Sequence, residues 1–167
     1  MEYPAWQATE DNSLRHIGPL ITISTVLLAT LSGNPAVAQT ENIASRAPAI
    51  GGYSPVSYFT KNIAERGSRK FAVEHRGSIY YLASAAQVEV FKQNPDKYRP
   101  RHKSCPYSLA FGRVTPLDPT NFKIVGDNLL LFHLSADEDG LQLWNDSDID
   151  EAELLRRADA NVFLMKF

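Results

Sequence analysis

The stretch from Phe91 to Gly112 constrains the fold more than any other part of the chain. It reads FKQNPDKYRPRHKSCPYSLAFG and contains three prolines and the only cysteine of the protein, Cys105. Each proline fixes its own φ and lacks a backbone N–H, so the stretch cannot continue as a regular helix or as a central strand. We therefore predict an ordered, non-regular loop that holds Cys105 in a defined place and carries any chemical site.

A secretory leader is predicted at the N-terminus. The basic residue Arg15 comes just before the apolar run Ile17–Leu31, and the small residues Ala36–Ala38 follow it. This order of basic residue, apolar core and small-x-small site is typical of a signal peptide. We therefore expect residues 1–38 to be cleaved off before Gln39 and the protein to be periplasmic or secreted. The run is shorter than the ~20 residues of a membrane span, and an uncleaved anchor is the alternative.

The remaining chain suits one domain, with a flexible lead-in at residues 39–49 and the domain itself at residues 50–167. The formal net charge of the whole chain is -2, and no basic stripe points to nucleic acid. An exported protein with a single cysteine cannot form an internal disulfide. Cys105 is therefore free, paired with another molecule, or liganded.

The patterns after residue 50 predict a small α+β domain, with two β-hairpins that form an antiparallel sheet packed with short helices. The predicted strands are Phe71–His75, Ser78–Leu82, Phe122–Val125 and Leu129–His133. The predicted longer helices are Ala85–Gln93, Ala136–Trp144 and Asp148–Ala160. Shorter ones are predicted after Ser54-Pro55 and at Ser108–Phe111.

The spacing of apolar residues also predicts which side chains are buried. In the helix 85–93, Val88 and Phe91 are three residues apart and should face inward, while the side with Gln87, Glu89 and Lys92 should face water. One shared core is predicted, made of Phe71, Val73, Tyr80, Leu82, Phe91, Ile124, Leu131 and Trp144.

A series of short motifs runs through residues 52–161. They are Gly52-Tyr53-Ser54-Pro55-Val56-Ser57-Tyr58-Phe59, Gly67-Ser68, Tyr80-Tyr81-Leu82-Ala83-Ser84, Asn94-Pro95-Asp96-Lys97-Tyr98-Arg99-Pro100, Cys105, Gly112, Asp118-Pro119, Phe122-Lys123-Ile124-Val125, Trp144 and Ala158-Asp159-Ala160-Asn161. Together they resemble the YHS domain family in its exported, single-domain form. Similar proteins usually carry Gly-Gly-Tyr-Cys-Ala where this chain has Lys103-Ser104-Cys105-Pro106, so the two glycines before the cysteine are missing.

The resemblance implies metal binding, because YHS domains are commonly supposed to bind metal and recur in metal-handling proteins. The candidate ligands are Cys105, His102 and His133, and thiolate and imidazole suit copper(I) or zinc. His102 and Cys105 are three residues apart and could face one ion, with His133 or His75 supplied by another element. The resulting hypothesis is a metal-binding accessory module centred on Cys105, with a metal ion or a metal-handling protein as its partner.

The same residues also support a metal-free interpretation. Free cysteines are often buried as small apolar residues, His102 then becomes a solvated loop residue, and His133 becomes a hydrogen-bonded residue on the sheet. The chain is then a non-catalytic binding or interaction module in which Cys105 is structural. Under either interpretation we expect no enzyme, because Cys–His catalysis needs an oxyanion hole and no motif for one is visible.

A basic patch is a further candidate for binding. Arg99, Arg101 and Lys103 alternate along the loop and could hold an anion, with an ordinary solvated loop as the alternative. Two patterns are missing from the sequence. It has no phosphate-binding loop, because Gly51-Gly52 lacks the strand–helix context and the lysine of such loops, and it has no paired catalytic carboxylates.

Overall fold

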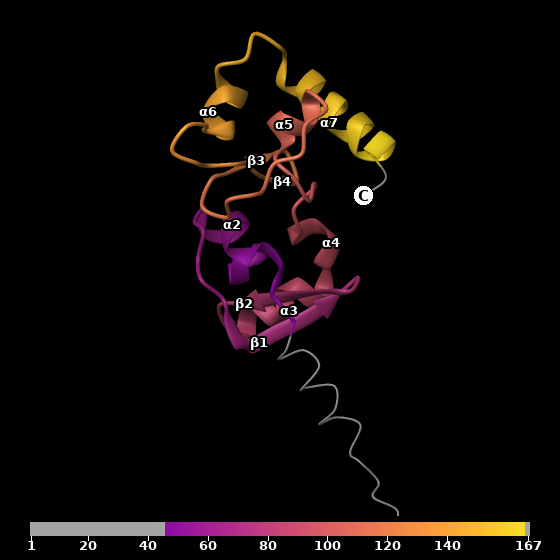
Figure 1. Ribbon diagram of the computed structural model, residues 1–167. Coiled ribbons are helices and arrows are strands. Elements are labelled where there is room, and N and C mark those ends of the chain that lie inside the picture. The colour runs from indigo at the N-terminus through magenta and orange to yellow at the C-terminus, as the bar shows by residue number, and fades with distance from the viewer. Residues whose placement is uncertain (1–45, 166–167) are drawn as a thin grey trace, which may run out of the picture. The chain divides into compact units, whose positions relative to one another are not determined.

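The computed structural model describes residues 46–165 of the 167-residue chain (Figure 1). The predicted leader and most of the predicted lead-in lie outside the described residues, so both stay predictions. Within residues 46–165, every helix is too short or too polar to cross a membrane.

The described residues form short helices and two β-hairpins, which confirms the predicted α+β class. The helices are η1 (Ala49–Gly52, a 3-10 helix), α2 (Pro55–Lys61), α3 (Ala85–Gln93), α4 (Pro95–Tyr98), α5 (Pro106–Ala110), α6 (Gly140–Asn145) and α7 (Glu151–Met165). The strands are β1 (Ser68–His75), β2 (Ser78–Leu82), β3 (Phe122–Val125) and β4 (Asn128–Leu131). Both pairs are antiparallel, and each hairpin is a two-stranded sheet of its own.

Each hairpin is closed by a two-residue turn, Arg76-Gly77 in the first and Gly126-Asp127 in the second. In β1–β2 the partners run from Ala72↔Tyr81 to His75↔Ser78. The connecting Arg76 and Gly77 have φ of 48° and 74°, and this pair of positive values suits the right-handed twist of a two-residue hairpin. In β3–β4 the partners run from Phe122↔Leu131 to Val125↔Asn128.

Local capping decides where the helices begin. The helix α3 has the predicted bounds, and Ser84 Oγ accepts a hydrogen bond from the Gln87 backbone N–H at 3.2 Å. The helix α6 begins at Gly140, later than predicted, because Asp139 Oδ1 caps it instead. The helix α7 begins at Glu151 rather than at Asp148, and Asp150 Oδ1 accepts from the backbone N–H of Ala152.

The stretch from Phe91 to Gly112 is more regular than predicted. Pro95 and Pro106 each stand in the first turn of a short helix, α4 and α5, where a missing N–H removes no helical hydrogen bond. The predicted irregular loop is therefore confined to residues 99–104, between these two helices. Cys105 takes the N-cap position of α5.

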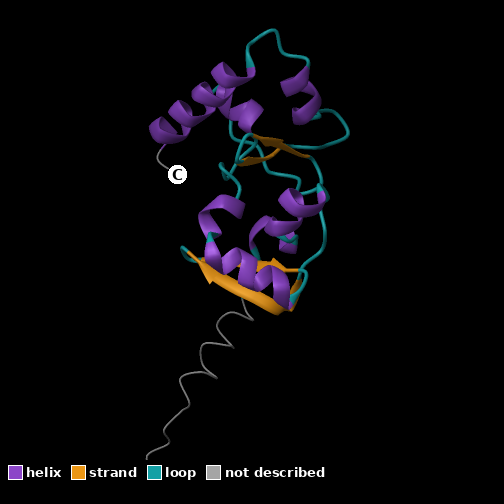
Figure 2. Cartoon of the chain, turned by 180° about the vertical axis from the view of Figure 1, so that it is seen from behind, coloured by secondary structure: helices purple, strands orange, loops and turns teal. Residues whose placement is uncertain are grey.

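The prediction of one shared core is wrong, because the buried apolar residues divide into three clusters. The first lies between β1–β2, α2 and α3 and contains Val56, Tyr80, Leu82 and Phe91. The second contains Tyr58, Leu129 and Leu131. The third contains Cys105, Leu109, Ala110, Leu130, Phe132, Trp144, Leu154 and Ala158. Figures 1 and 2 show the first hairpin with α3 at one end of the described unit, and α5, α6 and α7 at the other.

Gln87 is buried rather than water-facing, with 8% of its surface exposed, so the predicted polar face of α3 is wrong at this position. Its Oε1 accepts hydrogen bonds from Ser54 Oγ at 2.6 Å and from the Ala83 backbone N–H at 3.0 Å. Its Nε2 donates to Ser57 Oγ at 2.9 Å. The side chain thus joins α3 to the start of α2. Both of its polar atoms have hydrogen-bond partners, as buried polar groups require.

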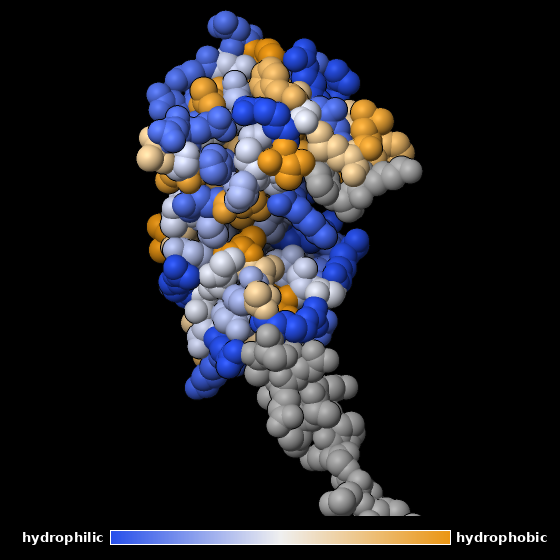
Figure 3. Space-filling view, in the orientation of Figure 1, coloured by the Kyte–Doolittle hydropathy of each residue, from blue (hydrophilic) through white to orange (hydrophobic). Residues whose placement is uncertain are grey.

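The surface in Figure 3 is mainly hydrophilic, with small hydrophobic groups between charged residues. The most exposed large apolar side chains are Phe163 and Leu164 near the end of α7, at 83% and 73%. A small number of exposed apolar side chains is normal on a protein surface, so the search for a site turns to the loop at residues 99–104.

Candidate functional site

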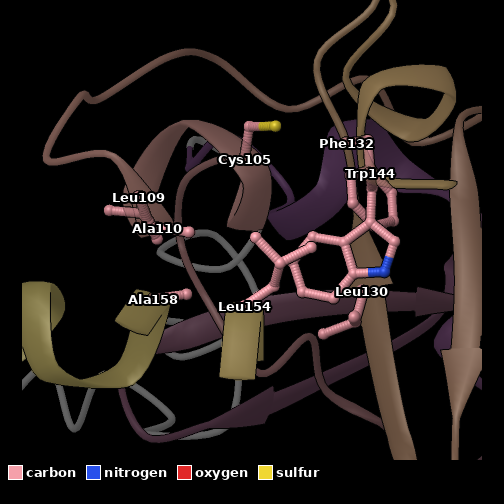
Figure 4. Packing of buried hydrophobic residues seen from close by; sticks show 8 residues of the cluster. All are labelled: Cys105, Leu109, Ala110, Leu130, Phe132, Trp144, Leu154 and Ala158. Carbon is pink, nitrogen blue, oxygen red and sulfur yellow. The ribbon is translucent and has the colours of Figure 1, made fainter. Parts of the chain in front are cut away.

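Cys105 is fully buried, with 0% of its surface exposed. Figure 4 shows it among apolar side chains that come from α5, β4, α6 and α7. A methyl group built on Gly140 would stand only 2.8 Å from Cys105 Sγ, so the sulfur packs directly against the Gly140 backbone. This is the environment of a small apolar residue, as in the metal-free interpretation.

The backbone on both sides of Cys105 is tied to Thr115. The Cys105 N–H donates to Thr115 O at 3.2 Å, and Ser104 Oγ donates to the same carbonyl at 2.7 Å. The Thr115 N–H donates back to Ser104 Oγ at 2.9 Å. With Pro106 fixing the first turn of α5, these bonds hold the Cys105 side chain toward the cluster.

His102 is not a solvated loop residue, and it belongs to no group of metal-binding side chains among the described residues. Only 6% of its surface is exposed, and Nε2 lies 2.8 Å from Asp159 Oδ1 on α7. Burial lowers the pKa of His102 below its ordinary value, although the hydrogen bond to Asp159 opposes this. A neutral ring that donates from Nε2 leaves Nδ1 as an acceptor, and Nδ1 is buried without a hydrogen-bond partner.

His133 is half-buried and follows the end of β4, so the prediction that it lies on the sheet is wrong. Its Nδ1 lies 3.1 Å from Pro116 O, and the ring nitrogen donates because a carbonyl oxygen can only accept. The His133 backbone O accepts from the Gly140 N–H at 2.9 Å. The structure thus brings the His133 backbone to the same glycine that Cys105 Sγ touches, while a ring nitrogen of His133 is bonded to Pro116. The other histidine considered as a ligand, His75, pairs instead with Asp96 at 2.9 Å.

The three predicted ligands do not fit a copper or zinc ion in this arrangement. Among residues 46–165 there is no group of three or more His, Cys, Asp or Glu side chains that could hold a metal. A thiolate site also needs further donors around the sulfur, and apolar residues surround Cys105. Metal binding at Cys105 would require this cluster to open, and the metal hypothesis stays a prediction.

The loop before Cys105 is clamped at its middle. Arg101 donates from Nε and from its terminal guanidinium to the two oxygens of Asp159, at 3.0 and 2.7 Å, and also donates to Asn128 Oδ1 at 2.6 Å. The Arg101 backbone N–H donates to Leu129 O at 3.0 Å. Burial raises the pKa of Asp159, but hydrogen bonds from Arg101 and His102 outweigh it and leave the pKa below its usual value. The carboxylate of α7 therefore fixes the loop in one conformation.

Three hollows border this loop, and Arg99 and Pro100 line all of them. We call the first the basic hollow: it has a volume of about 510 Å³, and its cationic lining residues are Arg76, Arg99 and Lys103. We call the second the mixed-charge hollow: it has about 350 Å³ and is lined by Asp96, Lys97, Arg99, Pro100, Arg101, Asp127, Asn128 and Asp159. The third, of about 240 Å³, has the cations Arg99, Arg101 and Lys103 beside apolar residues such as Leu109 and Val162.

Sequence reasoning found part of this site. It identified Arg99, Arg101 and Lys103 as a basic patch, and all three line the third hollow. Their partners differ, because Arg101 is paired with Asp159 and Arg99 with Asp96. Sequence reasoning missed Arg76, which reaches the basic hollow from the turn of the first hairpin. The acidic Asp159 in the closing Ala-Asp-Ala-Asn motif was the available signal for a partner of the basic loop.

Comparison of the chain with known proteins found no matching family model, no matching curated protein and no matching solved structure. The YHS resemblance therefore rests on the motifs in the sequence alone and stays a prediction. The functional argument below depends on the geometry of the described residues.

Proposed function

We propose that the protein is an exported, non-enzymatic binding module of the YHS type, in which Cys105 is structural and no metal is required. The observation that carries this proposal is the complete burial of Cys105, with its sulfur packed against Gly140. The polar loop just before it is exposed at Lys103, anchored at Arg101 and surrounded by hollows. Export rests on the predicted leader, and N-terminal sequencing of the recovered protein should begin at Gln39.

The metal-handling hypothesis needs a different state of the same region. A ligating cysteine must lose its proton and meet the ion together with other donors. In the structure Cys105 Sγ faces Phe132 and Trp144, as Figure 4 shows. The His102 ring is bonded to Asp159 on α7. These contacts favour the metal-free module.

The same contacts argue against a thiol enzyme. An activated cysteine needs an imidazole within hydrogen-bond reach of its sulfur. The contacts of His102 and His133 are instead to Asp159 and to Pro116. The second nitrogen of His102 has no partner at all, so it is not bonded to Cys105 Sγ either.

Metal content and thiol reactivity test this proposal together. The purified protein, after loading with zinc or copper(I) and removal of excess ion, should hold far less than one ion per chain. The Cys105 thiol should react slowly with a thiol reagent in the native state and rapidly in denaturant, and added metal should not change the native rate. A Cys105→Ala variant provides the matched control for metal bound elsewhere.

The opposite result would overturn the proposal. One ion per chain in the native protein, lost in the folded Cys105→Ala variant, would establish Cys105 as a ligand. Protection of the thiol by zinc or copper(I) at equimolar amounts would lead to the same conclusion. Circular dichroism of the variant shows whether the loss of metal is separate from a loss of fold.

A further inference from the structure

We propose that the basic hollow binds a small organic anion, in which a carboxylate or phosphate group is attached to an aromatic or aliphatic body. Lys103 is its principal charge partner, with Arg99 beside it. This inference rests on the proposed function, because it names the ligand class of the metal-free binding module. It goes beyond that proposal in assigning the residues that make the contact.

The charges around the basic hollow are not balanced. Its three cations are Arg76, Arg99 and Lys103, and a single carboxylate, Asp96, pairs with the two arginines. One oxygen of Asp96 pairs with Arg76 at 2.8 Å, and the other with Arg99 at 3.1 Å. The same carboxylate also accepts from His75 at 2.9 Å. Within residues 46–165, Lys103 has neither a hydrogen bond nor an ion pair, so an anion in the hollow would be its first partner.

The mixed-charge hollow provides an internal comparison. It shares Arg99 with the basic hollow, yet its three cations, Lys97, Arg99 and Arg101, face three carboxylates, Asp96, Asp127 and Asp159. An anion entering it would meet as many negative as positive groups. Electrostatic complementarity therefore favours the basic hollow over the mixed-charge hollow. The third hollow has less than half the volume of the basic hollow, and its cation Arg101 is already paired with Asp159.

The rest of the basic hollow suits an organic body rather than a bare ion. Its wall includes the side chains of Ile50, Tyr80 and Leu117. Its volume of about 510 Å³ lies in the range of small-molecule sites, which are largely apolar with a few polar groups that fix orientation. Burial raises the pKa of Tyr80, with Arg99 opposing it, so the hydroxyl stays protonated and can donate a hydrogen bond.

The wall that carries Lys103 is rigid, and His102 is a positioning residue in it. His102 lines both the basic hollow and the third hollow, and its ring is bonded to Asp159 on α7. Its Nδ1 is enclosed, so we assign the ligand contact to Lys103 and Arg99. A loop fixed before binding loses little conformational entropy when the ligand arrives.

Nuclear magnetic resonance titration of the full protein tests the ligand class. The probes are benzoate and phenyl phosphate, with benzamide as a neutral control of similar shape. The two anions should shift the backbone amide signals of residues 99–103 and of Tyr80 in a saturable manner, and benzamide should not. The anion that binds more tightly identifies the preferred group, and added salt should weaken both.

Charge variants test the assigned residues. Lys103→Gln should weaken anion binding about fivefold, as expected for the loss of one partly exposed ion pair. Lys97→Gln is the matched control. Lys97 lines the mixed-charge hollow but not the basic hollow, so this substitution should leave the anion affinity unchanged. Both lysines are exposed, so neither substitution should disturb the fold.

The inference is overturned if benzamide binds as tightly as benzoate, if Lys103→Gln leaves anion affinity unchanged, or if neither anion binds. It is also overturned if the shifted signals belong to Lys97 and Asp127 of the mixed-charge hollow, or to Leu109 and Val114 of the third hollow in place of Tyr80. These outcomes reject the anion site but leave a metal-free Cys105 in place. A stoichiometric metal held by Cys105 would reject the proposed function instead, so the two failures are separate.

Discussion

Lys103 and Cys105 are two residues apart in the sequence but lie in opposite environments. Lys103 is exposed and has no ionic partner among the described residues, whereas Cys105 is fully buried in an apolar cluster. The change occurs because Ser104 and Cys105 bind Thr115 and because Pro106 begins α5. Cys105, the residue with the more reactive side chain, is thus buried, and the side chain that can meet a ligand is that of Lys103. We call the apolar cluster around Cys105 the closed side and the loop at residues 99–104 the open side.

The two sides are also stabilised differently. Around Cys105 the stabilisation comes from buried apolar surface, worth roughly 25 cal/mol per Å². The loop side is held by the pair of Arg101 with Asp159, whose side chains are 36% and 39% exposed. Exposed ion pairs contribute little, about 0–1 kcal/mol. Substitutions on the closed side should therefore cost stability, and those on the open side should change binding.

The largest effect is expected for Phe132→Ala. Phe132 is fully buried in the cluster of Cys105, with its ring edge-to-face to Trp144 at a centroid distance of 5.5 Å. Its truncation should lower the free energy of unfolding by about 3–5 kcal/mol, as for large aromatic side chains in cores. Lys103→Gln, the matched change on the open side, should stay within about 0.5 kcal/mol. Denaturant unfolding measures both, and equal losses would remove the distinction between the two sides.

A smaller effect is expected for Gly140→Ala. The added methyl group would meet Cys105 Sγ at 2.8 Å and the His133 backbone N and O at 3.3 Å. Relief requires shifts in α5 or in the segment after β4, and overpacking of this kind costs about 1–3 kcal/mol. The substitution tests directly whether Cys105 fills a closed space.

A double-mutant cycle sharpens this test. In a Cys105→Ala background the sulfur is gone, so Gly140→Ala should cost less than in the wild-type protein, and the difference is the coupling between the two positions. The contact with the His133 backbone remains, so the relief should be partial. Equal costs in both backgrounds would mean that Cys105 Sγ does not pack against Gly140.

Local signals explain the parts of the fold that were predictable from the sequence. The turn at Arg76-Gly77 and the Ser84 cap depend only on neighbouring residues, and α3 has the predicted bounds. Both hairpins form where predicted, but β1 begins at Ser68 rather than Phe71, and β4 is Asn128–Leu131 rather than Leu129–His133. Gln87 did not follow its prediction, because its partners Ser54 and Ser57 come from α2, about thirty residues earlier. A polar side chain on a helix gives no local sign of such distant partners.

The candidate site was predictable to a smaller degree for the same reason. The sequence left open whether Cys105 is a ligand or a buried residue, and only the packing of α5, α6 and α7 around it favours burial. The basic patch was visible in the sequence, but the role of Arg101 depends on Asp159, 58 residues later. Arg99, another residue of the patch, is paired with Asp96, which lies outside the loop at residues 99–104. Such contacts across the fold decide which cation is left unpaired.

The smallest expected effect is a pH dependence of the free energy of unfolding that comes from His102. Burial lowers the pKa of His102 in the folded protein below its ordinary value of 6.5. The unfolded chain therefore takes up the proton first as the pH falls, so the free energy of unfolding should decrease below about pH 6.5. The decrease should end once the pH is below the folded pKa, because His102 is then protonated in both states. Asp159, whose folded pKa is also lowered, acts in a separate and more acidic range, below about pH 4.

Urea unfolding between pH 5 and pH 7.5 measures this dependence. His102→Gln keeps a side chain that can donate to Asp159 but removes the titrating group, so the decrease in stability toward pH 5 should become shallower than in the wild-type protein. Lys103→Gln, which leaves His102 in place, should keep the wild-type slope. A rise in stability toward pH 5 that His102→Gln abolishes would mean that the folded protein binds the proton more tightly. The attraction of Asp159 would then outweigh burial, and His102 would be charged in the wall of the basic hollow.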